Sequence, residues 1–407
     1  MPEHTETGFE ERARAWLAEQ APRHGWAAQG GRDRGVRDEA EYLKRAKECQ
    51  ALLFDNGFAG ISWPTEYGGQ GLGIREQILF NVASLDYDLP LGPYIIGLGM
   101  CGPTVLAVGT EEQKQRYIRP MLRGEEVWCQ LFSEPGAGSD VAGLSSRAVL
   151  DGDEWVLNGQ KIWTSGAQYC DYGIVIARTD PDVPKHKGIT MFILDLHAPG
   201  VTLRRITQID GGAHFNEVFF DDVRIPAENV LGGVGNGWLA ATTTLANERV
   251  SLGAVRAMND TPSAEDLIGR AREMGRSDDP VLRQKLVDLW LQERTVGLLG
   301  DRITSAILRG QTPGPEGSVA KLVRTDHARL SARLGAELAG PAATAWGRGS
   351  DDGQWAATLL FVPSLSIAGG TDEVLRNIIG ERVLGLPKEP QVDRDVPFRE
   401  LTGKAGR

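Results

Sequence analysis

The spacing of apolar residues changes twice along the chain, and this change constrains the fold more than any other feature. From Phe9 to about Arg123 apolar residues recur every three or four positions, which is typical of amphipathic helices. From about Trp128 they alternate, and after Pro226 the helical spacing returns and continues to about Gly385. The sequence therefore predicts an α+β protein in which a β domain lies between two helical domains.

The length of 407 residues also favours several domains, because single cores stop growing at ~250–300 residues. The middle domain is expected to be antiparallel and barrel-like, since no helix-length insert separates its strands. The last part of the chain is polar and is expected to be poorly ordered. We expect an N-terminal helical domain at 1–125, a middle β domain at 126–235, a C-terminal four-helix bundle at 236–388 and a polar tail at 389–407.

Composition excludes several classes of function. The formal net charge of -11 argues against nucleic acid as a partner, because binding a polyanion needs clustered basic side chains. There is no apolar run long enough to span a bilayer, and the start has no signal-like apolar region, so we expect a cytoplasmic protein. The four cysteines and six histidines lack metal-site spacing, so no metal is expected and each cysteine is interpreted as a small buried apolar residue.

Two glycine-containing patterns need a local interpretation. The stretch "GLGMCG" (97–102) has the letters of a dinucleotide-binding loop, but it follows no strand of a βαβ unit and Pro103 comes directly after it. Helix packing is the better explanation. In "DEWVLNGQKIW", the pair Asn158-Gly159 supplies the backbone freedom that a tight turn needs, so it predicts the turn of a β-hairpin.

The stretch "CQLFSEPGAGSDVAG" (129–143) is a candidate anion-binding loop. The backbone amides of Gly136, Gly138 and Ser139 can approach an anion closely, and the hydroxyls of Ser133 and Ser139 are further donors. The alternative interpretation is a glycine-rich interdomain linker.

An aromatic residue flanked by hydroxyls follows. Trp163 lies beside Thr164 and Ser165, and this arrangement suits a planar ring with polar edges. The alternative is a tryptophan that simply packs in the core.

Glu248 stands beside Arg249 in a stretch, "TLANERVSLGA", that is otherwise small and apolar. A buried carboxylate is costly unless it is paired. Glu248 is therefore either a member of an ion pair, with Arg249 or a neighbour, or a group placed for chemistry.

Five stretches in this order resemble the acyl-CoA dehydrogenase family over nearly the whole chain. They are "LFSEPGAGSDVAG", "LNGQKIWTSGA", "FFDDVRIPAENVLG", the Glu-Arg helix and "IAGGTDEVLRNIIGERVLGLP". The resemblance implies a helical domain, a β-barrel-like domain and a helical bundle. It also implies a flavoprotein that uses FAD to remove two hydrogens from the α and β carbons of an acyl-CoA thioester. The last stretch resembles a subgroup that includes bacterial dehydrogenases of steroid side-chain CoA thioesters.

The resemblance assigns roles to individual positions. Ser133 would contact the edge of the flavin ring, Trp163 and Ser165 would line its other side, and Gly138 and Ser139 would lie near the phosphates of the cofactor and of CoA. The cofactor-binding positions implied are Leu131, Ser133, Gly138, Ser139, Trp163, Ser165, Arg272 and Thr371. The substrate-binding positions implied are Ser139, Arg249 and Gly370.

The chain departs from the family at the catalytic base. The family commonly has a glutamate two residues before the threonine matched by Thr371, and here that position is Gly369. Some members carry the base on a helix of the C-terminal domain, directly before an arginine, and Glu248 matches that place. The main-chain amide of Gly369 would still donate to the thioester oxygen, which gains negative charge as the proton leaves. Glu373 and Glu381 are weaker candidates for the base.

The same departure leaves other functions open. A chain without a base would be a non-catalytic or cofactor-sharing subunit of a heteromeric enzyme, and an acyl-CoA oxidase or flavin monooxygenase on the same fold is a further alternative. The resemblance implies an electron-transferring flavoprotein as acceptor and either a homotetramer or an α2β2 assembly with a paralogous chain. The substrate would come from the β-oxidation of fatty, branched or steroid side-chain acyl groups.

Overall fold

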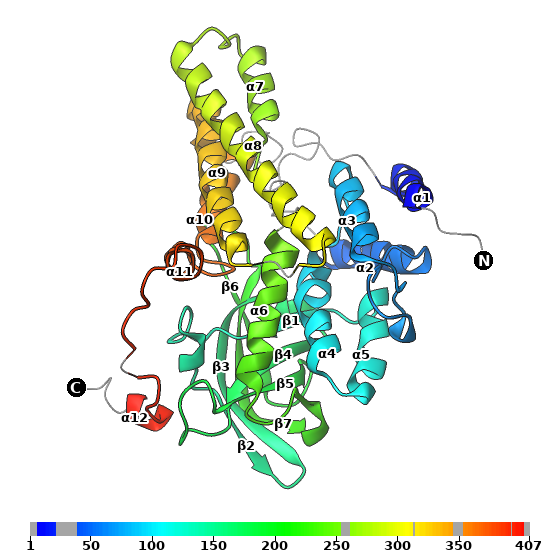
Figure 1. The fold of residues 1–407 in the computed structure, drawn as a ribbon, viewed down its shortest axis with the longest axis vertical. Coiled ribbons are helices and arrows are strands. Elements are labelled where there is room, and N and C mark those ends of the chain that lie inside the picture. Colours follow the sequence, from blue (N-terminus) through cyan, green and yellow to red (C-terminus); the bar gives the residue numbers. More distant parts are fainter. Residues whose placement is uncertain are drawn as a thin grey trace. The chain divides into compact units, whose positions relative to one another are not determined.

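A computed structural model describes residues 6–21, 39–253, 261–311, 314–344, 353–391 and 393–402 (Figure 1). The described chain divides into two compact units. The first contains the sheet and its covering helices, from residues 38–71, 90–248 and 388–407. The second contains the long C-terminal helices together with residues 72–89 and the first helix. Each unit is described by itself.

The sheet unit is built on eight strands. Their order in the sheet is β6-β7-β3-β2-β4-β5-β8, and β1 pairs with β4 in parallel. The other neighbours are antiparallel apart from a single parallel pairing of β2 with β4, as the alternating sequence predicts. The strands are β1 (Trp128–Leu131), β2 (Arg147–Asp151), β3 (Glu154–Ser165), β4 (Tyr172–Arg178), β5 (Ile189–Asp195), β6 (Val201–Ile206), β7 (Phe215–Pro226) and β8 (Val230–Leu231).

The hairpin turn lies elsewhere than the sequence predicts. Asn158 and Gly159 are inside the continuous strand β3, and the β2–β3 turn falls at Gly152, where φ is 67°. Gly159 instead marks a register shift, with φ of 145°, and a Cβ there would lie 2.7 Å from the Cα of Ser146. The Asn-Gly prediction is therefore wrong, because this glycine serves a bulge and a close strand approach.

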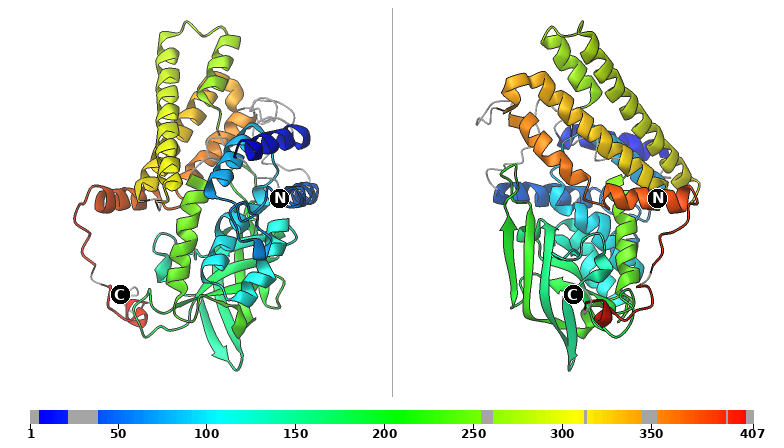
Figure 2. Two further views of the ribbon diagram at one scale, coloured as in Figure 1. Left: turned by 45° about the vertical axis from the view of Figure 1, so that its right-hand side comes forward. Right: turned by 90° about the vertical axis from the view of Figure 1, so that its left-hand side faces the viewer.

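Helices cover one face of the sheet (Figure 2). The helix α2 (Glu39–Asp55) packs on α5 (Glu111–Arg123), and the sheet face is covered by α4 (Gly102–Val108), α5 and α6 (Gly237–Gly253). Their apolar side chains share one buried core with the sheet, which includes Ile118, Met121, Trp128, Ile174, Ile193 and Ala240. The "GLGMCG" stretch forms a π-helical turn, Gly97–Cys101, that leads into α4, so its interpretation as helix packing is confirmed.

The second unit is helical. The helices α8 (Pro280–Leu308), α9 (Glu316–Ala339) and α10 (Gly353–Leu365) pack with α7 (Ala264–Glu273) around a core that includes Leu267, Leu289, Leu334 and Trp355. The unit also contains α1 (Glu6–Gln20), α3 (Ile74–Ala83) and the short α11 (Asp372–Ile378). Within the described ranges, no helix combines the length and the apolar character that crossing a membrane requires.

The C-terminal tail makes specific contacts. Its described part ends in the short helix α12 (Phe398–Thr402), and Phe398 is buried against the sheet unit. Residues 393–402 are therefore docked on the sheet unit, which differs from the expectation of poor order for this part of the tail. The segment shows no periodic pattern of apolar residues, because a single buried aromatic residue and a few ion pairs hold it in place.

Candidate functional site

The glycine-rich loop that follows β1 is tied to the sheet by a buried ion pair. The Lys161 ammonium, on β3, lies 2.8 Å from the Glu134 carboxylate, and the Lys161 side chain is 0% exposed. The same ammonium donates to the carbonyl of Phe132 at 3.0 Å. Both charged side chains were missed in the sequence, since a lysine within a strand ordinarily faces solvent.

Glu134 also fixes the far end of the loop. Its carboxylate accepts hydrogen bonds from the amide and hydroxyl of Ser145 at 2.6 and 2.9 Å and from the amide of Ser146 at 3.0 Å. Burial raises the pKa of Glu134, but attraction and hydrogen bonding from Lys161 and the serine donors outweigh it, so this pKa lies below its ordinary value. Burial lowers the pKa of Lys161 to about 8 despite the attraction of Glu134. The carboxylate is thus charged at neutral pH.

Between these anchors the loop presents its main chain outward. Gly136, Gly138 and Ser139 are exposed, and a Cβ built on either glycine would meet no atom within 4 Å. Ser133 is half-buried, and its carbonyl accepts from the amide of Ile162 on β3 at 2.9 Å. The loop therefore has open space where a ligand can approach backbone amides, which is the space that a side chain would otherwise fill. Leu131, in contrast, is fully buried in β1.

Trp163 has a strained backbone and an exposed ring. Its φ is 61°, in the left-handed region that non-glycine residues rarely occupy, and it lies in a bulge between Lys161 and Thr164. The residue is 56% exposed, and its ring packs edge-to-face against Phe215 at 6.0 Å between centroids. Ser165 is half-buried and pairs with Phe215 in the sheet register. Strain of this kind tends to occur at functional sites, so Trp163 is a candidate ligand contact.

A buried amide supports the bulge. The side-chain amide of Asn216, on β7, donates to the carbonyl of Thr164 at 3.2 Å and to the side chain of Gln168 at 2.7 Å. Asn216 and Thr164 are both buried. No feature of the pattern around Asn216 distinguishes it from an ordinary strand residue, so the sequence did not reveal this support.

In the helical unit, Gly369 and Gly370 form a left-handed turn before α11. Their φ values are 68° and 90°, which a residue with a Cβ adopts only with strain. Thr371 begins α11 as its N-cap, and its hydroxyl accepts from the amide of Val374 at 3.2 Å. The Lys321 ammonium, on α9, donates to the carbonyl of Gly370 at 3.0 Å. The turn is therefore fixed with its main chain in a defined position.

A buried carboxylate holds the same turn. Asp372 is buried and pairs with Lys321 at 3.3 Å and Arg329 at 3.1 Å, both from α9. Sequence reasoning missed all three residues. Lys321 and Arg329 are eight positions apart, and this spacing places both on one side of a helix. The spacing does not indicate which carboxylate they contact.

The remaining candidates are placed less completely. The backbones of Glu248 and Arg249 lie within α6, but their side chains are outside what the structure describes. Arg272 is exposed on α7, and Glu373 is exposed at the start of α11, 4.0 Å from Arg376. The predicted positions thus fall in two sets, with Leu131 to Ser165 in the sheet unit and Arg272 and 369–371 in the helical unit.

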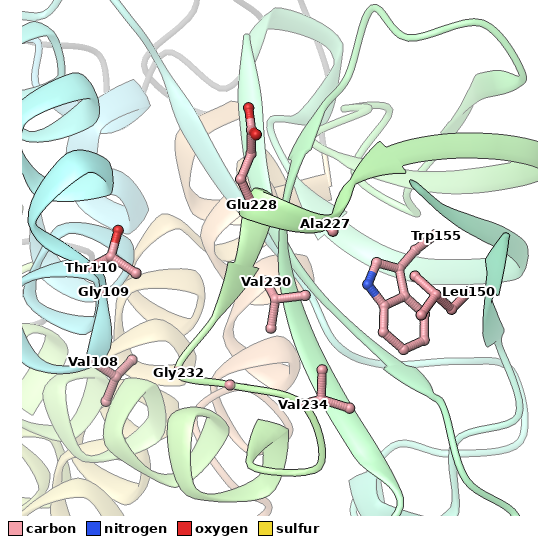
Figure 3. Close-up of a pocket in the computed structure, with 11 residues that line it drawn as sticks. Val108, Gly109, Thr110, Leu150, Trp155, Ala227, Glu228, Val230, Gly232 and Val234 are labelled. Carbon is pink, nitrogen blue, oxygen red and sulfur yellow. The ribbon is translucent and has the colours of Figure 1, made fainter. Parts of the chain in front are cut away.

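Two hollows lie in the sheet unit. One, of about 280 Å³, is lined by Gly136, Glu134, Gly159 and neighbouring residues of the same loop and strand. The other, of about 470 Å³, lies between the start of α5 and the β2–β3 hairpin (Figure 3). Its lining is mostly apolar, with Trp155 and Val230 facing inward, and includes no predicted site residue. Its polar side chains are those of Thr110 and Glu228.

The described acidic, histidine and cysteine side chains are the possible ligands of a metal site. Among them, no three histidine, cysteine, aspartate or glutamate side chains are grouped to hold a metal ion. Cys101, Cys129 and Cys170 are buried, and burial raises the pKa of the Cys101 and Cys170 thiols. These cysteines are therefore core residues, as interpreted.

Comparison with known families covers nearly the whole chain. Residues 5–125, 129–223 and 235–384 match the N-terminal, middle and C-terminal domains of acyl-CoA dehydrogenase. Acyl-CoA dehydrogenase IpdE1 of Mycobacterium tuberculosis is 36% identical over 385 residues, which cover 94% of this chain and 98% of IpdE1. Acyl-CoA dehydrogenase FadE34 of the same organism is 39% identical over 340 residues, or 83% of this chain. That match spans only 46% of FadE34.

Solved structures have the same architecture. A structure described as the Tcur3481-Tcur3483 steroid ACAD aligns with a TM-score of 0.80 and 30% identity, covering 94% of this chain and 98% of the other. The ChsE4-ChsE5 complex from Mycobacterium tuberculosis aligns with a TM-score of 0.76 and 29% identity, covering 96% and 100%.

Proposed function

We propose that this chain, which belongs to the acyl-CoA dehydrogenase family, converts an acyl-CoA thioester to its 2-enoyl-CoA by removing two hydrogens. That family consists of FAD-dependent oxidoreductases. The observation that carries the proposal is the pairing, in one unit, of an open glycine loop with an exposed, strained Trp163. The exposed amides suit a phosphate and the aromatic face suits a planar ring, so the residues fit FAD.

When bound, FAD would accept the hydride from the β carbon. Trp163 and Ser165 would line its ring, Ser133 would donate to the ring edge, and Gly138 and Ser139 would approach the phosphates through their amides. The Glu134–Lys161 ion pair supports this assignment, because it holds the loop without using the outward-facing amides. Leu131, Arg272 and Thr371 are assigned to the cofactor on the resemblance alone.

Glu248 is proposed as the base that takes the α-proton, and the amide of Gly369 as a donor to the thioester oxygen. A carboxylate in an apolar slot is a stronger base when ionised, because its charged form is disfavoured there. The left-handed turn supports the second role. Gly369 has no side chain that could cover its main-chain amide, and Lys321 holds the carbonyl of the adjacent Gly370. Ser139, Arg249 and Gly370 are assigned to the substrate.

A bulky acyl group of the steroid side-chain type is the proposed substrate class. It is supported by the relative described as a steroid ACAD, whose fold covers nearly all of this chain. The Tcur3481-Tcur3483 steroid ACAD and the ChsE4-ChsE5 complex are each described by two chain names. This supports assembly with a paralogous chain in place of a homotetramer. An electron-transferring flavoprotein is the proposed acceptor.

A second candidate is a non-catalytic subunit that shares a partner's cofactor. The glycine at position 369, where the family commonly has its base, favours it. The two candidates differ in one property, since only the first requires Glu248 for chemistry.

An anaerobic absorption spectrum tests the proposal. The purified chain, alone and with a candidate partner chain, is titrated with straight, branched and steroid-type acyl-CoAs. We expect the flavin band to bleach with the steroid-type class, and Glu248→Gln to abolish the bleaching while acyl-CoA binding by calorimetry is retained. Glu273→Gln, the same change at an exposed glutamate, should have no effect. Bleaching at an unchanged rate in Glu248→Gln would disprove the assignment of the base.

A further inference from the structure

We infer that the C-terminal segment 393–402 is a strap that positions the Ser139 half of the glycine-rich loop through two cations, Lys185 and Arg178. The identity of the ligand at that loop rests on the proposed function, whereas the strap itself rests on contacts within the sheet unit. It makes Lys185 and Arg178 positioning residues, and it gives the polar tail a role at the proposed cofactor site.

The strap is docked by its main chain as well as by its side chains. Pro397 forms an isolated β-bridge with Pro184, in the segment between β4 and β5. The amide of Phe398 donates to the carbonyl of Val183 at 3.0 Å, and the amide of Arg399 donates to the carbonyl of Pro181 at 3.0 Å. Together these bonds fix the register of the tail on that segment.

Lys185 joins the strap to the loop by charge. Its ammonium lies 2.9 Å from the carboxylate of Asp393 on the strap and 3.0 Å from that of Asp140, the residue directly after Ser139. The Lys185 side chain is only 14% exposed, whereas the side chains of Asp140 and Asp393 are 62% and 36% exposed, so the ammonium is the desolvated member of both pairs. Without Asp393, the Lys185 ammonium would keep only the carboxylate of Asp140 as an ion-pair partner among these two.

Arg178 makes the second connection. Its guanidinium lies 3.7 Å from the centre of the Phe398 ring, and Phe398 is 8% exposed. The same guanidinium donates to the carbonyls of Ala142 at 2.7 Å and Leu144 at 3.2 Å, in the second half of the loop, and to the carbonyl of Lys185. Burial lowers the pKa of Arg178 to about 10, so the group stays charged at neutral pH. A cation stacked on an aromatic face is held in orientation by it.

The two connections act on a specific half of the loop. Its first half, with Ser133, is fixed to β3 by the Glu134–Lys161 pair and does not depend on the tail. Its second half, from Asp140 to Leu144, is held by Lys185 and Arg178, each of which also contacts the strap. Loss of the strap should therefore loosen the second half and leave the first half in place.

Hydrogen exchange on the full-length protein tests the strap directly. The double variant Asp393→Asn/Phe398→Leu removes the carboxylate and the ring while keeping an apolar side chain. We expect amides of residues 140–144 to exchange at least several-fold faster, and the hydrogen-bonded amides of Glu134 and Ala137 in the first half of the loop to be unchanged. Asp395→Asn, the same charge change at an exposed neighbour, is the matched control and should change neither. Unchanged exchange in 140–144 of the double variant would overturn the inference.

A second measurement separates the strap from the proposed function. FAD release is followed by fluorescence after dilution, and the double variant should release FAD faster than both the parent and Asp395→Asn. Faster exchange in 140–144 with an unchanged release rate would show a strap that does not serve the cofactor, and would overturn that part of the inference. If no variant or parent retains FAD, the proposed function fails while the exchange result still decides the strap.

Discussion

Trp163 holds a backbone conformation that costs about 1–2 kcal/mol for a residue with a Cβ, yet the residue is largely exposed to solvent. A residue selected for stability alone would be glycine at this position or would bury the ring. The sequence predicted an aromatic face here, but the strain arises from the bulge between Lys161 and Thr164, and no pattern of residue types encodes a bulge.

Trp163→Gly should separate stability from ligand binding. Relief of the left-handed strain offsets the loss of a half-buried ring, so the free energy of unfolding should change by less than about 2 kcal/mol. Bound flavin should be lost, because the aromatic face is gone. Trp163→Phe keeps a ring and the strain, and it should retain more flavin than the glycine variant. Urea unfolding and the flavin-to-protein absorbance ratio measure both effects, and full flavin content in Trp163→Gly would contradict the assignment.

At the scale of elements, the boundaries between helical and β segments could be predicted, but the internal irregularities could not. The spacing of apolar residues changes near Trp128 and Pro226, because each segment places its apolar side chains on the face that it buries. This spacing can be seen within a short stretch of sequence. The turn at Gly152 and the bulge at Gly159 both use glycine with positive φ, and only the packing of Gly159 against Ser146, directly before β2, distinguishes the two. The Glu134–Lys161 pair could not be predicted either, because its members are 27 residues apart and only the tertiary structure brings them together.

Glu134→Gln tests how the loop is joined to β3. It leaves the fully buried Lys161 ammonium without its carboxylate, which should cost about 3–5 kcal/mol of unfolding free energy. Asp151→Asn, which breaks an exposed pair with Arg224, should cost less than about 1 kcal/mol and serves as the control.

The same pair predicts a pH dependence. The pKa of Glu134 is lower in the folded protein than in the unfolded chain, so its contribution is fully present above the ordinary carboxyl pKa of about 4 and is lost as the pH falls through the lower, folded value. Denaturant unfolding between neutral pH and pH ~3 should therefore show a smaller loss of stability in Glu134→Gln than in the parent. Parallel profiles would contradict the ion pair.

For the whole molecule, α8 carries an apolar stripe that the described residues of the chain do not cover. Val287, Leu291 and Leu298 are exposed and lie on one face of the helix, opposite the buried Leu286 and Leu289. Exposed apolar stripes of this kind mark contacts with another chain. The stripe supports the proposed assembly, although residue types alone could not distinguish a second copy from a paralogous chain.

The double variant Leu291→Glu/Leu298→Glu should lower the molar mass measured by light scattering, because two charges would have to be buried at the contact. Leu150→Glu, the same change at an exposed leucine of the β2–β3 hairpin, should leave the mass unchanged. An unaltered mass in the α8 variant would exclude this face as the contact. Co-expression with a candidate partner chain then distinguishes a mixed assembly from a homomer.

The turn at Gly369 and Gly370 limits which side chains position 369 can accept. The φ of Gly369 is 68°, so a single substitution of this glycine by glutamate would introduce strain of about 1–2 kcal/mol. The adjacent turn, tied to α9 by Lys321, resists the shift that would relieve that strain. The conformation therefore disfavours an acid–base side chain at this position, and under the proposed function that chemistry falls to another residue.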